Sequence, residues 1–166
     1  MMISQKMAKR LNVQVNHEFF NALSYTAIAY WFEEQGLKVF AKFFFKQADE
    51  ERGHGQKIAQ YIIDQGAEVK LTAVEQPKVT FKSAKEVMEN FVELEVKTTK
   101  MVHEIAAMAQ AESDFATRNF VDWKVAEQVE EVASANEMLN MVKHAETFGQ
   151  LLMLEGRVYL IIEGKA

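Results

Sequence analysis

The sequence predicts an all-α protein, a four-helix bundle with one long crossover between helices two and three and a short C-terminal fifth helix. Three observations predict this fold. Four long segments carry apolar residues at alternating spacings of three and four, the pattern of helices packed side by side. Only 7 glycines and 1 proline occur among the 166 residues, too few for a protein built from many tight turns. The longest interval without helical periodicity, residues 66–81, lies near the middle of the chain.

The four long helices are bounded by residues typical of helix ends. A Ser or Asp that can cap the first turn precedes three of them, and a Gly follows three of them. Ser83 and Glu86 form a capping-box pattern at the start of the third helix. The expected ranges are residues 4–34, 38–65, 83–111 and 114–147. The apolar tail from Leu151 to Ile162, interrupted by Gly156, is expected to form the short fifth helix.

The central interval decides the topology of the bundle. Fully extended, it can reach about 53 Å, whereas the second helix is about 42 Å long. It can therefore run the whole length of the bundle and leave the second and third helices parallel. Short loops at Gly36 and Ser113 make the other consecutive pairs antiparallel. Since no linker-like stretch divides the chain, residues 1–166 are expected to form a single domain.

Composition excludes several classes of protein. Lys and Arg total 19 against 24 acidic residues, and a net charge of −5 argues against a nucleic-acid partner. The absence of Cys excludes a disulfide framework and thiolate metal sites. No stretch approaches the roughly 18 apolar residues that span a membrane, and the first residues contain no signal-peptide core. A cytoplasmic protein that contacts no membrane is therefore expected.

On each predicted helix, a row of core-facing residues forms a seam. Each seam is interrupted near its centre by groups that do not belong in an apolar interior. Counting residues along the antiparallel first pair places Glu18 and Glu51 at the same height, about 21 Å along the bundle. The separation of Glu18 and Glu51 in the chain equals that of Glu95 and Gln128, as in a doubled helical hairpin. The interrupting groups are Glu18, Glu51 with His54, Glu95, and Gln128 with Glu131.

Several buried carboxylates at one height require a compensating charge. An isolated buried ion costs several kcal/mol, and neighbouring carboxylates raise one another's pKa. Bound metal ions resolve this, and oxygen ligands with one imidazole suit iron, manganese or zinc better than copper. Glu51, central to both halves, is the natural bridge between two metal ions. Glu50, Glu127 and Glu130 flank the seam and add to the local negative charge.

These residues resemble the ferritin family, specifically the haem-free prokaryotic ferritins. Glu51-Arg52-Gly53-His54 is similar to one Glu-x-x-His motif of di-iron carboxylate proteins, while the second position reads Gln128-Val129-Glu130-Glu131. The sequences Asp114-Phe115-Ala116-Thr117, Trp123 and Ala126-Glu127-Gln128 match as well. Arg52 stands where haem-binding relatives have Met, so no haem is expected.

The resemblance implies a ferroxidase that stores and detoxifies iron. It assigns Glu18, Glu51 and His54 to a first iron, and Glu51, Glu95 and Gln128 to a second, with Glu131 close by. Glu50, Glu127, Glu130 and Glu131 match a third, weaker iron site. Glu51 and Tyr25 are the catalytic candidates, Tyr25 because it matches a tyrosine beside the two-iron site. Fe(II) would be oxidised by O₂ or H₂O₂ and deposited as ferric mineral inside a shell of twenty-four subunits.

Two alternatives stay open. The first is a rubrerythrin-like di-iron oxidase or peroxidase that stores no mineral. The second is a structural helical assembly with a vestigial metal site. Lys124 is the reason to retain this alternative. Lys124 lies one turn before Gln128, where it could weaken the second iron or pair with a site glutamate. His17, His103 and His144 lie off the seams and are expected on the surface.

Overall fold

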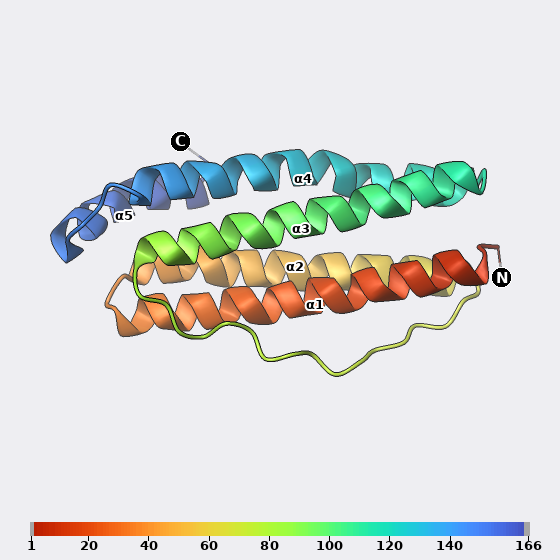
Figure 1. The fold of residues 1–166 in the computed structure, drawn as a ribbon, viewed down its shortest axis with the longest axis horizontal. Helices are drawn as coiled ribbons and strands as arrows, with labels where there is room; N and C mark the ends of the chain where they lie inside the picture. The colour runs from red at the N-terminus through yellow and green to blue at the C-terminus, as the bar shows by residue number, and fades with distance from the viewer. Residues whose placement is uncertain (1, 165–166) are drawn as a thin grey trace.

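The computed structural model describes residues 2–164, which form five α-helices and no strand (Figure 1). Two antiparallel hairpins, α1–α2 and α3–α4, lie against each other, and α5 folds back at one end (Figure 1). This confirms the predicted four-helix bundle with its long crossover and fifth helix. The bounds are Gln5–Glu34 for α1, Lys38–Asp64 for α2, Ala84–Ala111 for α3, Phe115–Val142 for α4 and Phe148–Ile162 for α5.

Local sequence sets the helix ends largely as expected. Ser4 accepts a hydrogen bond from the Met7 N–H, and Ser83 accepts one from the Glu86 N–H. Asp114 caps α4 in the same way. Gly36 and Gly66, which follow α1 and α2, adopt φ values of +78° and +72°, a conformation that glycine reaches without a steric penalty.

The predicted boundary between α4 and the tail was wrong. The fourth helix ends at Val142 rather than near Thr147. Thr147 instead caps α5, accepting a hydrogen bond from the Gln150 N–H while the Gln150 side chain bonds back to Thr147. Gly156 does not interrupt α5, which continues through it to Ile162.

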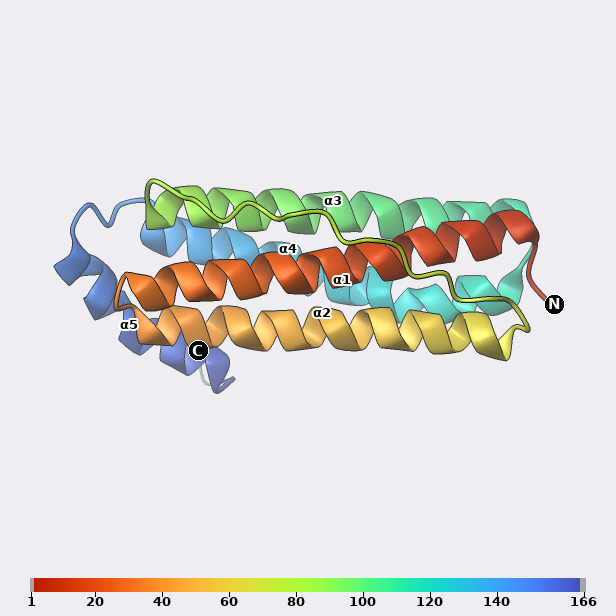
Figure 2. The ribbon, with the colours of Figure 1, turned by 90° about the horizontal axis from the view of Figure 1, so that it is seen from below.

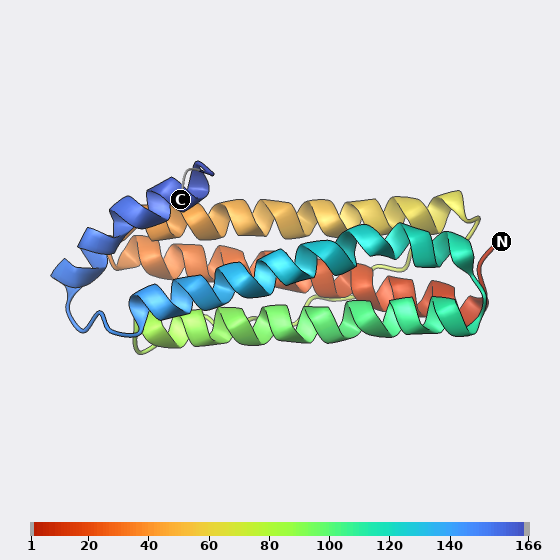
Figure 3. The ribbon, with the colours of Figure 1, turned by 90° about the horizontal axis from the view of Figure 1, so that it is seen from above.

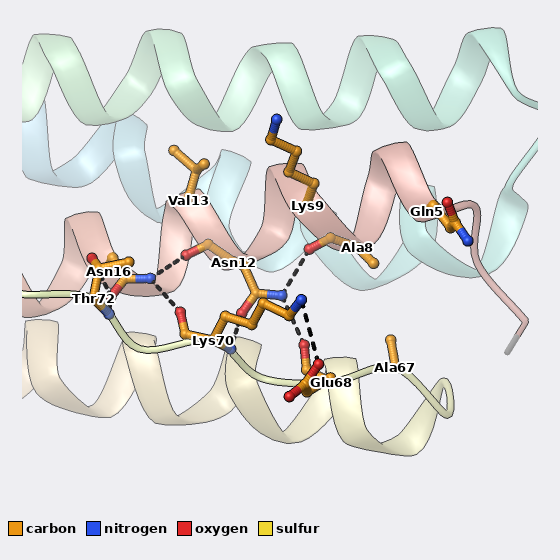
Figure 4. A pocket seen from close by; sticks show the side chains of 10 residues that line it. All are labelled: Gln5, Ala8, Lys9, Asn12, Val13, Asn16, Ala67, Glu68, Lys70 and Thr72. Atoms are coloured by element: carbon orange, nitrogen blue, oxygen red, sulfur yellow. Dashed lines mark hydrogen bonds and ion pairs between the residues drawn. The ribbon is translucent and has the colours of Figure 1, made fainter.

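Two asparagines on α1 hold the crossover against the bundle. The crossover runs the length of the bundle across α1 (Figure 2). Asn12 donates to the Glu68 carbonyl at 2.9 Å and accepts from the Lys70 N–H at 2.5 Å. Asn16, one turn later, donates to the Lys70 carbonyl and accepts from the Thr72 N–H, both at 2.8 Å (Figure 4). The two side chains therefore pair with the extended backbone as a neighbouring strand would.

The fifth helix docks beside the start of α2 (Figure 3). The residue before α2, Leu37, has no side chain that can cap it. Glu155 of α5 fills this role, because its Oε1 accepts from the Val39 N–H at 2.6 Å and from the Phe40 N–H at 3.3 Å. A negative charge at a helix N-terminus also stabilises the helix dipole.

The apolar interior consists of two clusters, one at each end of the bundle. One surrounds Phe32, Phe44 and Phe91, and the other surrounds Leu11 and Ile105. A layer of polar side chains lies between them. None of the helices in residues 2–164 is both long and apolar enough to cross a membrane.

Candidate metal centre

All four long helices contribute to the buried polar layer. Glu18 and Glu95 are 0% exposed, Glu51 and Gln128 are 1% exposed, and His54 is 8% exposed. Glu51 and His54 share one face of α2 because residues three apart in a helix are neighbours. The contributing helices are α1 for Glu18, α2 for Glu51 and His54, α3 for Glu95, and α4 for Gln128.

Glu18, Glu51 and His54 form a group with the geometry of a metal site. One ligand atom from each residue lies within 4.8 Å of the others. His54 Nδ1 is 3.4 Å from Glu51 Oε1, and Gln14 donates to Glu18 Oε1 at 2.6 Å. Within residues 2–164 no other group of three or more acidic or histidine side chains converges in this way. The structure thus brings together the three residues predicted for the first iron.

Unpartnered oxygens in this layer match what a metal ion would need. Glu18 Oε2, Glu51 Oε2 and Gln128 Oε1 are buried, and none has a hydrogen-bond partner among the described residues. A buried carboxylate oxygen without a partner is costly. Oxygens of this kind beside an imidazole fit a cation such as iron, manganese or zinc.

Tyr25 and Gln128 hold Glu95 on the other side of the layer. The buried Tyr25 hydroxyl donates to Glu95 Oε1 through a short hydrogen bond. Gln128 Nε2 donates to Glu95 Oε2 at 3.1 Å and to Thr99 Oγ1 at 3.2 Å. Burial and the nearby carboxylate charges raise the pKa of Tyr25 well above its usual value, so the phenol keeps its proton. Glu95 is therefore fixed at both oxygens.

The acids limit their mutual repulsion by retaining protons. Burial and repulsion from Glu51 raise the pKa of Glu18 to about 8. Burial favours protonation of Glu51 as well, but its interactions with Glu18, His54 and Lys124 outweigh burial and lower the pKa of Glu51. Burial and the charges of Glu95 and Glu51 raise the pKa of Glu131 to about 8. Metal ions that enter the layer would replace these protons.

Lys124 lies inside the ligand group. Its Nζ is 2.7 Å from His54 Nδ1, 3.3 Å from Glu127 Oε2 and 3.9 Å from Glu51 Oε1. Burial lowers the pKa of Lys124, but attraction by the surrounding glutamates outweighs this and raises it. Lys124 thus pairs with a site glutamate, one of the two outcomes expected from the sequence, and its nearest polar neighbour is His54.

His54 contacts a charged side chain through each of its two ring nitrogens. Burial lowers the pKa of His54, but hydrogen bonds with Glu127 and Glu51 raise it to about 9. Nδ1 lies 2.7 Å from Lys124 Nζ. The other ring nitrogen, Nε2, lies 3.2 Å from Glu127 Oε1, so each ring nitrogen of His54 has a polar neighbour.

The acids predicted for a third iron are more exposed than the acids at the centre of the buried layer. Glu127 contacts His54 and Lys124, and Glu131 is half-buried. Glu50 accepts from Gln47 at 2.6 Å, whereas Glu130 is exposed. The structure therefore places these acids between the centre and the surface without joining them into one ligand group.

The prediction that His17 lies on the surface was wrong. His17 is 7% exposed, and its Nε2 lies 2.9 Å from Thr98 Oγ1, which also accepts from Asn21. The reason is that α1 buries a second face against α3, beside the face that carries Glu18. His103 and His144 are exposed, as expected. Gln14, whose contact with Glu18 was not predicted, could have been found from its spacing of four residues before that acid.

Comparisons with known proteins give matches over most of the chain. Residues 8–145 match a family model described as "Ferritin-like domain". A "Bacterial non-heme ferritin" of Staphylococcus aureus (strain MRSA252) is 39% identical over 139 residues, 84% of each chain. A ferritin of the archaeon Archaeoglobus fulgidus, described as a novel open pore ferritin, superposes with a TM-score of 0.92 at 40% identity over 95% of this chain and 98% of that one. A "Humanized Archaeal ferritin" gives a TM-score of 0.92 at 37% identity over 95% of this chain and 96% of that one.

Proposed function

Because this chain belongs to the ferritin family, we propose that it takes up iron, oxidises Fe(II) to Fe(III) and stores it as a ferric mineral inside a protein shell. The observation that carries the proposal is the buried group of Glu18, Glu51 and His54, with ligand atoms within 4.8 Å of one another. Iron is the substrate and cargo of this site.

The donor set supports two adjacent iron positions. Glu18, Glu51 and His54 would hold the first iron, and Glu51, Glu95 and Gln128 would hold the second. Each iron position includes a buried oxygen that has no hydrogen-bond partner among residues 2–164. This oxygen is Glu18 Oε2 at the first position and Gln128 Oε1 at the second. Glu51 interacts electrostatically with both Glu18 and Glu95, which suits a shared, bridging carboxylate.

In the proposed reaction Fe(II) supplies the electrons and O₂ accepts them, while the chain supplies geometry and charge. The carboxylates favour Fe(III) over Fe(II) because they compensate the additional positive charge. Tyr25 donates to Glu95 and so orients it. The surrounding apolar clusters keep bulk water away from the layer.

Glu50, Glu127, Glu130 and Glu131 would serve a third, weaker iron position that links the centre to the surface. Support comes from their graded exposure. The Glu127 side chain, which contacts His54, is 32% exposed, and Glu130 is exposed. Carboxylates along such a route would lower the free energy of a cation leaving the buried layer.

We also propose that the chain self-associates into a shell, with twenty-four subunits by the family resemblance. The exposed surface of α1 and the crossover supports this proposal. Val13, Leu23 and Tyr30 of α1 are 48%, 42% and 59% exposed. Leu71 of the crossover is 66% exposed. A groove of about 800 Å³ between α1 and the crossover, into which Asn12 and Lys70 project, continues this surface (Figure 4). Exposed apolar surface of this kind marks contacts between protein chains.

One observation favours a second candidate function. Lys124 occupies space among the predicted ligands, as it would in a structural assembly whose metal site is vestigial. A di-iron oxidase or peroxidase without storage is the remaining alternative. The cytoplasmic location, the single domain, the absence of haem and the absence of nucleic-acid partners stay predictions, as does the choice between O₂ and H₂O₂.

Aerobic addition of Fe(II) to metal-free protein separates the candidates. Iron oxidation is followed by absorbance, and iron retained per particle is measured after size-exclusion chromatography. Hundreds of irons in a large particle are expected for storage, whereas a few irons with continued turnover indicate an oxidase. If the protein neither oxidises nor retains iron, the structural assembly is the interpretation that remains.

Glu51→Ala tests the bridging assignment directly. We expect it to abolish rapid oxidation while the metal-free bundle stays folded, because the apolar clusters on both sides of the layer are unchanged and Glu127 still pairs with Lys124. Glu93→Ala, which removes an exposed acid on α3, is the matched control and should oxidise iron as the wild type does. Rapid oxidation by the Glu51 variant would show that Glu51 is not the bridge.

A further inference from the structure

Lys124 places a positive charge inside the candidate metal centre. Among residues 2–164 it is the one buried lysine or arginine, with an exposure of 1%. Its stem crosses from α4 to α2, so the ammonium faces residues of the first iron position and not the surface. Its nearest polar atoms belong to His54, Glu127 and Glu51.

His54 cannot serve Lys124 and a metal ion at the same time. An unprotonated imidazole nitrogen has one lone pair, in the plane of the ring. Lys124 Nζ lies 2.7 Å from Nδ1 and so blocks the direction of the Nδ1 lone pair, and the other ring nitrogen lies 3.2 Å from Glu127 Oε1. Nδ1 is also the ring atom that faces Glu51, at 3.4 Å from its Oε1. A metal ion bound by Glu51 and His54 needs that same lone pair.

We propose that Lys124 is a built-in competitor of the first metal ion, which binds Glu18, Glu51 and His54 only when the lysine side chain withdraws. The inference rests on the proposed function, because it takes these three residues as a metal site. Its consequence is that the first position binds divalent metal more weakly than its ligands alone would allow. Lys124 in this way determines how the two halves of the centre share metal.

The structure offers the withdrawn side chain a place to go. Glu127 lies three residues after Lys124 on α4, and the two are already paired at 3.3 Å. The Glu127 side chain is 32% exposed, whereas that of Glu51 is 2% exposed. A rotation of the lysine away from His54 can therefore keep one ion pair and bring the ammonium nearer to water, where a charge is less costly.

A purely structural role is the contrasting interpretation, in which Lys124 only neutralises the buried acids. Both roles predict that removing the charge lowers the stability of the metal-free protein. Removing a positive charge beside the acids also tightens cation binding in either role, but only competition predicts that this gain depends on His54. Affinity for a redox-inert metal therefore separates the two roles without any measurement of iron oxidation.

The test titrates Zn²⁺ into chelator-treated protein by calorimetry and compares wild type with Lys124→Met, which keeps the apolar stem and removes the ammonium. We expect one binding step to tighten by about tenfold or more, within the usual range of coupling between sites. Lys57→Met is the matched control. Lys57 is exposed, and its Nζ lies 3.6 Å from the centre of the Trp123 ring beside the site, so this variant removes a nearby charge that does not contact His54. Its Zn²⁺ affinity should change far less.

A double-mutant cycle assigns the step. Adding His54→Ala to Lys124→Met should cancel the gain, because the competed ligand is gone. Equal affinity of wild type and Lys124→Met, or a gain that survives His54→Ala, would overturn the inference while leaving the proposed function intact. Absence of Zn²⁺ binding in every variant would overturn the proposed function itself. Lys124→Gln replaces the Met variant if that protein does not fold.

Discussion

The metal-free protein should lose stability as the pH rises from about 5.5 to about 7.5, with Glu131 contributing about 2 kcal/mol of the loss. Burial, followed by repulsion from Glu95 and Glu51, raises the pKa of Glu131 from 4.5 to about 8. Across this interval the folded chain keeps the Glu131 proton and the unfolded chain has released it. Each pH unit then removes up to about 1.4 kcal/mol of folding free energy. The contribution is complete below the unfolded pKa and is lost as the pH passes the folded one.

The assay is urea unfolding of chelator-treated protein across this pH range, for wild type and for Glu131→Gln. The amide has the shape of the protonated acid but cannot titrate, so the difference between the two proteins isolates Glu131 from Glu18 and His17. Glu93→Gln, an exposed site on α3, is the control and should follow the wild type. Saturating Zn²⁺ should reverse the wild-type slope, because the metal binds where protons leave. The unfolding free energy of the wild type minus that of Glu131→Gln should fall by about 2 kcal/mol between about pH 5.5 and 7.5, and a value that stays flat or rises with pH would refute the reasoning.

Three further predictions concern single contacts. Gly53→Ala should stabilise α2 by about 1 kcal/mol, because a Cβ at position 53 would meet nothing within 4 Å. Gly55→Ala should destabilise α2, because a Cβ at position 55 would lie 2.9 Å from the Phe19 ring. The urea midpoints of the two variants should therefore move in opposite directions. Glu155→Ala should weaken the first turn of α2 by about 1 kcal/mol, visible as faster amide hydrogen exchange there, and unchanged exchange would contradict the capping role. Tyr25→Phe keeps the ring packing but removes a hydrogen bond to the buried carboxylate of Glu95. The unfolding free energy should therefore fall by about 2 kcal/mol. An unchanged unfolding free energy would show that this bond does not stabilise the fold.

The fold could be predicted because its determinants are periodic or local. Alternating spacings identified the helices, Ser4, Ser83 and Asp114 marked their starts, and the reach of the crossover gave the topology. The end of α4 was missed because Thr147 suits the start of a new helix as well as the continuation of an old one. Gly156 did not end α5 because an interior glycine costs a helix only about 1 kcal/mol.

The site could be predicted only where helical position alone decides it. Heights along the helices were enough to bring Glu18, Glu51 and His54 together. The direction of Lys124 depends on the rotamers of a long flexible side chain, which periodicity does not determine. The burial of His17 depends on how α1 is rotated against α3, a property of the packed pair that neither helix shows alone.

The separation of the apolar interior into two clusters makes the two ends of the bundle independent in their response to mutation. Side chains around Leu11 at one end and Phe32 at the other share no neighbours, so the free-energy changes of paired substitutions should add. Evolution or a designer can therefore repack one end for heat tolerance without disturbing the other. The buried polar layer between the clusters lies outside this additivity, because its side chains share hydrogen bonds and charges.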